Sequence, residues 1–219
     1  MAKLMIGGIY MQRENKLFST VNLIKMALLA VIAVILMQFV AIKLPAIFPS
    51  FLELDLSEVP AIIGILTVHP LAGIVIVILK NILKVLLFQT TTAYVGELAN
   101  IVISIGYILP LTLMTRKKRS LKQVGLGLGL GVVTMTIVGA VVNYYIMLPL
   151  YAKLFMPLDS IIEMGHVIYS KIVDKGTLIL YSIVPFNLVK GTLVAGASIL
   201  LVRGLKPVIV QLGYKADTK

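Results

Sequence analysis

The chain has 219 residues, of which 59% are hydrophobic and 13% are charged, and its formal net charge is +11. Soluble domains are about 45 to 50% apolar, so this composition excludes an ordinary soluble protein and predicts an integral membrane protein. The sequence contains no cysteine, which excludes disulfides, thiolate catalysis and cysteine-based metal sites.

Residues 1–19 form a short basic segment, which predicts a cytoplasmic tail that lies along the membrane surface. The apolar run over 20–42 follows, and at about 1.5 Å per residue it is long enough to cross a hydrocarbon core of about 30 Å. A cleaved signal peptide is the alternative. It is disfavoured because the apolar part is too long and the basic lead-in is too extended.

A structured external loop is predicted where this pattern stops, within the sequence IFPSFLELDLSEVPAII at 47–63. Ser57 is a candidate N-cap that starts a helix at Glu58. We expect residues 43–58 to cap an apolar ligand at the rim of a membrane bundle, and a solvated connector is the alternative. The sequence of this loop alternates with the period of an extended segment, which gives it one apolar edge and one solvent-exposed edge. The alternating residues are Leu52, Leu54 and Leu56 on the apolar edge and Glu53, Asp55 and Ser57 on the other.

The remaining chain is divided into further apolar spans. The second begins at Glu58 and is short, because His69 and Pro70 predict a tight turn after it. An amphipathic connection over 149–176 and a cytoplasmic tail over 203–219 complete a single membrane domain over 1–219. The predicted fold class is all-α with six transmembrane helices, of which the third to the sixth occupy 71–88, 97–114, 124–148 and 177–202.

The distribution of basic residues supports this topology. Thirteen of the twenty Lys and Arg residues lie on the side of the two termini, including the run from Arg116 to Arg119. By the positive-inside rule, both termini are cytoplasmic and the loop at 47–63 faces outside. The distribution also explains the positive charge without nucleic acid, which we do not expect as a partner. The opposite loops hold only Lys43, Lys153, Lys171 and Lys175.

Lys80, Lys84 and Lys190 lie inside predicted spans. A charge at mid-bilayer costs on the order of 3 kcal/mol, so each lysine should face a polar interior or reach an interface. Lys84 is near the external end of its span and can snorkel. Lys80 is deeper, and we predict a structural ion pair between it and Glu97.

Lys190 is the strongest candidate for a functional group, because it is far from both ends of its span. Asn187 lies three residues earlier on the same helix face, and Pro185 frees a backbone carbonyl in the preceding turn. Asn143, followed by two tyrosines, lies near the external end of the fifth span and is expected to face Lys190 and Asn187. The two amides, the ammonium and the tyrosine hydroxyls would then form one polar cluster. Such a cluster suits a neutral, aromatic, hydroxyl-rich solute, and an interhelical hydrogen-bond network without a ligand is the alternative.

Catalytic and metal-binding motifs are missing from the sequence. It has no HExxH, GxSxG or Walker A motif, so we assign no catalytic residue and expect a partner to supply energy. His69 and His166 are too isolated to form a metal site. Glycines recur at every second position early in the fifth span and predict close packing against neighbours on both sides, namely Gly125, Gly127, Gly129 and Gly131.

Five ordered motifs resemble one family. They are FPSFLELDLSEVPAIIG at 48–64, HPLAGIVIVILKNILK at 69–84, GELAN at 96–100, NYYIMLPLY at 143–151 and PFNLVKG at 185–191. Together they resemble the riboflavin-specific S components of energy-coupling factor (ECF) transporters. The resemblance implies a six-helix subunit of the bacterial cytoplasmic membrane that binds riboflavin from outside beneath its first external loop. It also implies association with a transmembrane T subunit and two ABC-type ATPases, and no cofactor.

The resemblance also implies roles for particular residues. The family presents an alanine motif on its first helix to the T subunit, and Ala27, Ala30 and Ala33 form a small face here, spaced by three instead of the usual four. An S component for a different vitamin and, from another class, a membrane-embedded enzyme are the alternative functions. The implied substrate-binding residues are Asn143, Asn187 and Lys190 as hydrogen-bonding groups, Phe51 and Leu54 in the covering loop, and Glu97 and Asn100 in a recurrent motif.

Overall fold

The computed structural model describes residues 3–6, 9–12, 17–90, 92–116 and 120–204, and only the backbone of the first two ranges. The basic run at 117–119 and most of the predicted tail at 203–219 lie outside these residues. Where the sequence predicts only an N-terminal tail, strands β1 (Lys3–Ile6) and β2 (Ile9–Gln12) pair as an antiparallel hairpin.

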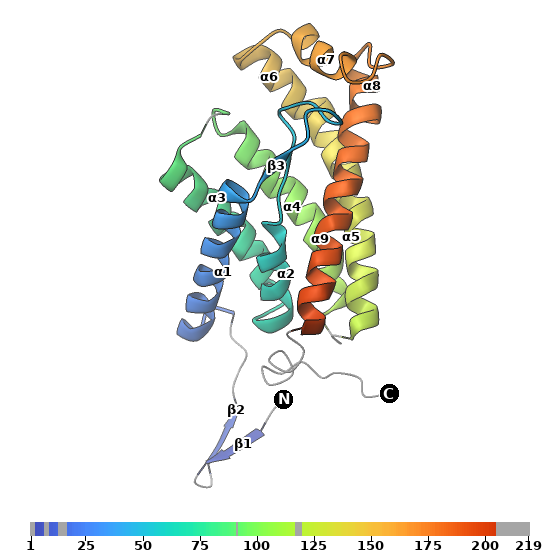
Figure 1. The fold of residues 1–219 in the computed structure, drawn as a ribbon. Helices are drawn as coiled ribbons and strands as arrows, with labels where there is room; N and C mark the ends of the chain where they lie inside the picture. The colour runs from blue at the N-terminus through green and yellow to red at the C-terminus, as the bar shows by residue number, and fades with distance from the viewer. Residues whose placement is uncertain (1–2, 7–8, 13–16, 91, 117–119, 205–219) are drawn as a thin grey trace.

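The described chain is mostly helical, and its long helices lie side by side in a bundle (Figure 1). The short helices α6, α7 and α8 lie at one end of this bundle, and α1 begins and α9 ends at the other. The elements are α1 (Thr20–Phe39), β3 (Ile42–Lys43), β4 (Glu53–Leu54), α2 (Glu58–Thr67), α3 (Ala72–Phe88), α4 (Val95–Met114), α5 (Leu121–Val142), the π-helix η1 (Asn143–Met147), α6 (Leu148–Leu154), α7 (Leu158–His166), α8 (Lys175–Leu178), the π-helix η2 (Ile179–Ile183) and α9 (Val184–Gly204).

Four continuous helical segments of the described chain are long and apolar enough to cross a membrane. Two of these are compound, because the chain stays helical from α5 through α6 and from α8 through α9. The other two predicted spans are shorter: α2 has 10 residues and α3 has 17. The prediction of a short helix that begins at Glu58 is therefore confirmed. The four long segments are Thr20–Phe39, Val95–Met114, Leu121–Leu154 and Lys175–Gly204.

Each compound segment contains a π-helix that ends two residues before a proline, Pro149 after η1 and Pro185 after η2. Proline lacks the N–H that an α-helix needs and its ring clashes with the preceding turn. The wider π turn absorbs this defect without ending the helix. The fifth segment consequently continues to Leu154, and its predicted end at Leu148 is wrong.

The α4–α5 contact depends on small residues. An added Cβ at Gly127 would lie 2.8 Å from the Cα of Leu111, and one at Gly131 would meet the carbonyl oxygen of Tyr107. Gly125 and Gly129, on the other face of α5, have nothing within 4 Å of an added Cβ. The expectation of close packing on both glycine faces is confirmed for one face and wrong, within this chain, for the other.

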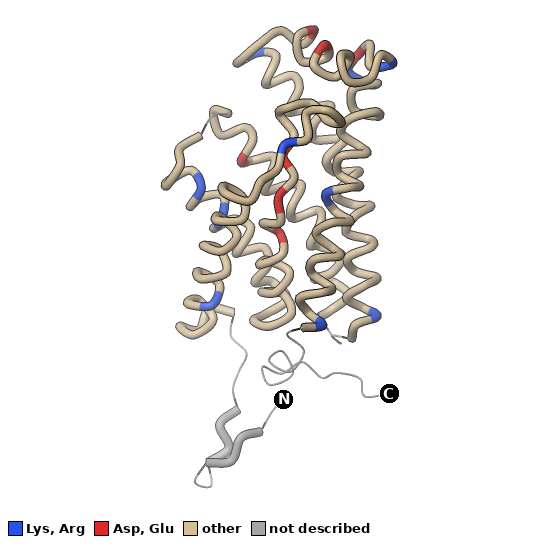
Figure 2. Tube along the Cα trace, viewed as in Figure 1, with Lys and Arg blue, Asp and Glu red and all other residues tan. Residues whose placement is uncertain are grey.

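The predicted external loop lies between α1 and α2. Strands β3 and β4 pair antiparallel, so the extended period is confirmed over two residues only. Glu53 is exposed and forms an ion pair with Lys43 at 3.1 Å. Asp55 and Ser57 are buried, so the prediction of a wet edge is wrong for these two residues. Figure 2 shows acidic positions that continue from this loop into the bundle.

Candidate functional site

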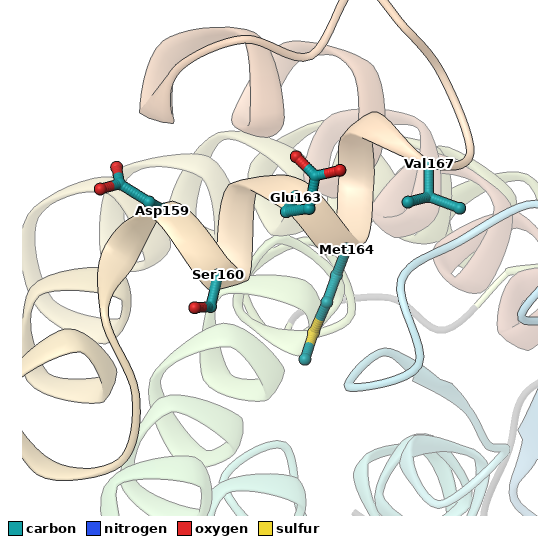
Figure 3. Close-up of a pocket in the computed structure, with 5 residues that line it drawn as sticks. All are labelled: Asp159, Ser160, Glu163, Met164 and Val167. Atoms are coloured by element: carbon teal, nitrogen blue, oxygen red, sulfur yellow. The ribbon is translucent and has the colours of Figure 1, made fainter.

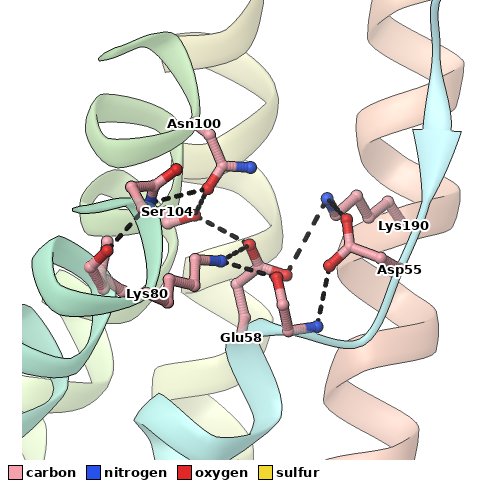
Figure 4. A network of polar contacts seen from close by, with 9 residues as sticks. Asp55, Glu58, Lys80, Asn100, Ser104 and Lys190 are labelled. Carbon is pink, nitrogen blue, oxygen red and sulfur yellow. Dashed lines mark hydrogen bonds and ion pairs between the residues drawn. The ribbon is translucent and has the colours of Figure 1, made fainter. Parts of the chain in front are cut away.

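Two buried lysines and two buried acids form an ion network at the junction of the external loop, α2, α3 and α9 (Figure 4). We call Asp55, Glu58, Lys80 and Lys190 the central ion network. The two positive and two negative charges balance. Since a buried charge is tolerated only when it is paired, this balance explains how all four residues lie inside an apolar bundle.

Lys190 is paired with the external loop. Its Nζ donates to Asp55 Oδ2 at 2.7 Å and lies 3.9 Å from Glu58 Oε2. The other oxygen of Asp55 accepts a hydrogen bond from the backbone N–H of Ser57 at 2.8 Å. Burial raises the pKa of Asp55, but the charges of Lys190 and Lys80 outweigh it and lower the pKa to about 2. The Asp55 carboxylate is therefore ionised at physiological pH.

Lys80 has different partners from the one predicted. Its Nζ donates to Glu58 Oε1 at 2.9 Å and to Ser57 Oγ at 2.7 Å. Glu97 instead accepts from Lys84 at 2.6 Å. The predicted Lys80–Glu97 pair is wrong, because Glu97 lies in the first turn of α4, beside the C-terminal end of α3 where Lys84 is. Ser57 begins α2 but makes no capping hydrogen bond with its side chain.

The central ion network extends onto α4. Ser104 Oγ donates to Glu58 Oε1 at 2.8 Å and to Asn100 Oδ1 at 3.4 Å, and Asn81 Nδ2 donates to the same Asn100 oxygen at 3.2 Å. Asn100, a predicted substrate residue, is thus connected to the network. Glu97 is not, since its described partners are Lys84, Thr90 and Thr92.

One oxygen of the network is unsatisfied. Glu58 Oε2 is fully buried and has no hydrogen-bond partner among the described residues, whereas Glu58 Oε1 has two. Leaving a buried acceptor unpaired costs about 1 to 3 kcal/mol, and more for a charged group. Glu58 Oε2 therefore has only the long ion pair with Lys190, at 3.9 Å, to offset this cost among the described residues.

The two predicted amides, Asn143 and Asn187, meet at Gly139 of α5. Asn143 Nδ2 donates to the Gly139 carbonyl at 2.8 Å, and an added Cβ at Gly139 would lie 2.8 Å from Asn187 Nδ2. Asn187 Nδ2 in turn donates to the carbonyl of Ile183 at 2.8 Å. Both Oδ1 atoms are without a hydrogen-bond partner in the described part of the chain, so both amides keep an acceptor for a ligand.

The two tyrosines after Asn143 do not join the amides. Tyr145 is 71% exposed. Tyr144 packs edge-on against Tyr145, and Lys175 Nζ lies 3.9 Å from the centre of the Tyr144 ring. Among the described residues, neither tyrosine hydroxyl hydrogen-bonds to Asn143 or Asn187, so the expectation that these hydroxyls complete the polar cluster is wrong.

The external loop is anchored next to the amides. Phe48 is buried and packs edge-on against Phe186, the neighbour of Asn187, with ring centroids 5.4 Å apart. Of the predicted covering residues, Phe51 is exposed and Leu54 is half-buried in β4. The loop thus crosses α9 at the candidate site.

The three alanines of the predicted partner face are not equivalent. Ala27 is exposed on α1, but Ala30 and Ala33 are fully buried. A continuous Ala27–Ala30–Ala33 docking face is therefore not present on the surface. For Ala27, whose side chain is exposed, contact with the T subunit stays a prediction.

Helix α7 borders a separate shallow cavity of about 500 Å³ (Figure 3). Its lining residues come from α7 and the residue after it, and its two carboxylates, Asp159 and Glu163, are exposed. The cavity includes none of the candidate substrate residues. Within the ranges that the structure describes, no group of three or more His, Asp or Glu side chains could hold a metal ion.

Asp55, Glu58, Ser57 and Ser104 were not predicted as site residues. The sequence did contain one signal, because lysines within spans require buried acids. Asp55 lies just before the second helix and Glu58 is its first residue. The residue separations of 135 between Asp55 and Lys190 and 22 between Glu58 and Lys80 hid the pairing.

Comparisons with known proteins agree with this architecture. Residues 21–202 match the family model of the ECF transporter, substrate-specific component. The chain is 33% identical to the riboflavin transporter FmnP of Bacillus subtilis (strain 168), over 87% of this chain and 94% of the relative. It is 31% identical to the riboflavin transporter RibU of Staphylococcus aureus (strain TCH60), over 89% and 95% respectively. A solved S component of a bacterial ECF transporter matches with a TM-score of 0.65 and 32% identity, over 85% of this chain and 96% of that one.

Proposed function

Since the chain belongs to the substrate-specific S components of ECF transporters, a family of multi-pass membrane proteins that are not enzymes, we propose that its substrate is riboflavin. Two relatives that are at least 31% identical carry the name riboflavin transporter. The isoalloxazine ring would lie against apolar side chains beneath the external loop, and Asn143, Asn187 and Lys190 would bind its polar groups.

One observation carries this proposal beyond the names of relatives. Asn143 and Asn187 come from different helices, meet at Gly139 and keep both Oδ1 atoms unpartnered among the described residues. Riboflavin is neutral and offers an imide N–H and several hydroxyl donors to such acceptors. Specificity follows because an analogue without these donors leaves the amide oxygens of the buried Asn187 and the half-buried Asn143 unpaired.

We also infer the finer topology and the partners. Six crossings, formed by α1, α2, α3, α4, α5 to α6 and α8 to α9, would place both termini in the cytoplasm and the external loop outside. The chain would work with a transmembrane T subunit and two ABC-type ATPases, which supply the energy for uptake.

Titration with riboflavin, followed by quenching of flavin fluorescence, tests the substrate. Asn187→Leu and Asn143→Leu should each cost about 1 to 3 kcal/mol of binding free energy with the fold retained, because each removes a hydrogen-bonding group from the site. Lys153→Leu, at an exposed external lysine, is the control and should bind as the wild type does. Lys190→Leu is less clean, because it also removes the counter-ion of Asp55.

A panel of other vitamins in the same titration distinguishes riboflavin from the substrates of sister S components. Tighter binding of another vitamin would contradict the proposal. Unchanged riboflavin affinity in both asparagine variants would remove these residues from the site.

A further inference from the structure

The ion pair between Asp55 and Lys190 ties the external loop to α9. Asp55 lies between β4 and α2, and both side chains of the pair are at most 8% exposed. The loop's other described contacts with the bundle are apolar, at Phe48, Leu52 and Leu56, or uncharged, at Ser57, whose hydroxyl accepts a hydrogen bond from Lys80 at 2.7 Å. The Lys43–Glu53 pair lies within the loop and is exposed. Asp55 is therefore the buried charge by which the loop is held.

Releasing Asp55 would be costly if Lys190 then had no partner, because an unpaired buried ammonium is strongly unfavourable. Glu58 provides the alternative. Its Oε2 is fully buried, forms a long ion pair with Lys190 Nζ at 3.9 Å, and has no hydrogen-bond partner among the described residues. A shift of the lysine side chain by about 1 Å would convert this long ion pair into a direct, charge-assisted hydrogen bond.

Glu58 can accept a hydrogen bond from Lys190 while its carboxylate keeps its hydrogen bonds to Lys80 and Ser104. Its Oε1 is held by Lys80 at 2.9 Å and by Ser104 at 2.8 Å, so one oxygen fixes the carboxylate and the other is spare (Figure 4). Glu58 stands on α2, whereas Asp55 stands on the loop. The two acids that face Lys190 thus belong to a fixed and a detachable part of the chain.

We propose that Asp55 and Glu58 are positioning residues that share the Lys190 ammonium: Asp55 latches the closed loop to α9, and Glu58 Oε2 takes over the ammonium when the loop lifts. This inference rests on the proposed function, in which riboflavin enters beneath the loop. It explains the unsatisfied oxygen of Glu58 as the second position of a two-position contact.

Hydrogen–deuterium exchange of the ligand-free full chain in lipid nanodiscs tests the latch. In Asp55→Asn, amide exchange in residues 42–57 should rise several-fold, with exchange in α4 and α5 unchanged. Glu53→Gln is the matched control, because it breaks the exposed ion pair two residues away in the same loop. Unchanged exchange in Asp55→Asn, or an equal rise in Glu53→Gln, overturns the proposal. So does an Asp55→Asn chain that does not fold, because Glu58 should then hold Lys190.

Stopped-flow mixing with riboflavin separates a latch from a ligand contact. If Asp55 is a latch, Asp55→Asn should raise both the association and the dissociation rate constants for riboflavin several-fold, since the loop opens more readily for entry and exit. A change in the dissociation rate constant alone would make Asp55 a ligand contact and overturn the proposal. If the wild-type chain binds no riboflavin, the proposed function fails, but the exchange result for the ligand-free protein still decides the latch.

Discussion

At the scale of single residues, the protein keeps charges inside an apolar bundle by pairing each with a partner from another element. Lys80 on α3 is fully buried and meets Glu58 and Ser57, at the start of α2. Lys84, one turn further along α3, is 19% exposed and meets Glu97 near the end of the bundle. The same residue type on one helix therefore has two different energetic roles.

This difference can be measured by matched substitutions. Lys80→Met should lower the free energy of unfolding by about 3 to 5 kcal/mol, because it leaves Glu58 buried with less positive charge around it. Lys84→Met should cost on the order of 1 kcal/mol, because its ammonium is near water and Glu97 keeps two threonine donors. Thermal unfolding in a mild detergent gives both values. Equal losses would show that depth in the bundle does not set the strength of these pairs.

At the scale of elements, prolines and glycines determine how the helices position Asn143 and Asn187. The π-helices η1 and η2 precede Pro149 and Pro185; η1 begins at Asn143, and η2 ends four residues before Asn187. Irregular turns of this kind are frequent at functional sites. Gly139 lies between the two amides on α5, where an added Cβ would displace the Asn187 carboxamide.

The α4–α5 contact offers a second matched test. Gly127→Ala should lower stability by about 1 to 3 kcal/mol, because the added Cβ overlaps the backbone of Leu111. Gly129→Ala adds the same atom on the open face of the same helix and should leave stability unchanged or raise it by up to about 1 kcal/mol. Thermal midpoints of the two variants in one detergent are compared. A larger loss for Gly129→Ala would mean that its face is covered in the membrane.

At the scale of the whole molecule, the bundle has two different ends. Helices α6, α7 and α8 and the external loop gather at one end, where the ion network begins, and α1 starts and α9 finishes at the other (Figure 1). In the proposed topology the looped end faces outside, so the substrate would enter there. The proposed function therefore predicts one orientation of the chain in the membrane.

The absence of native cysteine makes the orientation directly testable with single-cysteine variants. Val167→Cys, at a position that is 77% exposed next to α7, should react with a membrane-impermeant maleimide in intact cells. Leu121→Cys, 44% exposed at the start of α5, should react only after the membrane is permeabilised. The reverse pattern would contradict the positive-inside assignment.

The sequence by itself determined the membrane class, the helix that restarts at Glu58 and the turn at His69, because these depend on local composition and on the conformational limits of proline. It also identified Lys190, Asn187 and Asn143, because a polar side chain within an apolar span stands out without any knowledge of its neighbours. Only the tertiary structure decided that Asp55 and Glu58 are the partners of Lys190 and that Glu97 belongs to Lys84. Coulomb attraction acts between any opposite charges, so the choice among acids depends on which helices pack together, and that information is spread across contacts far apart in the chain.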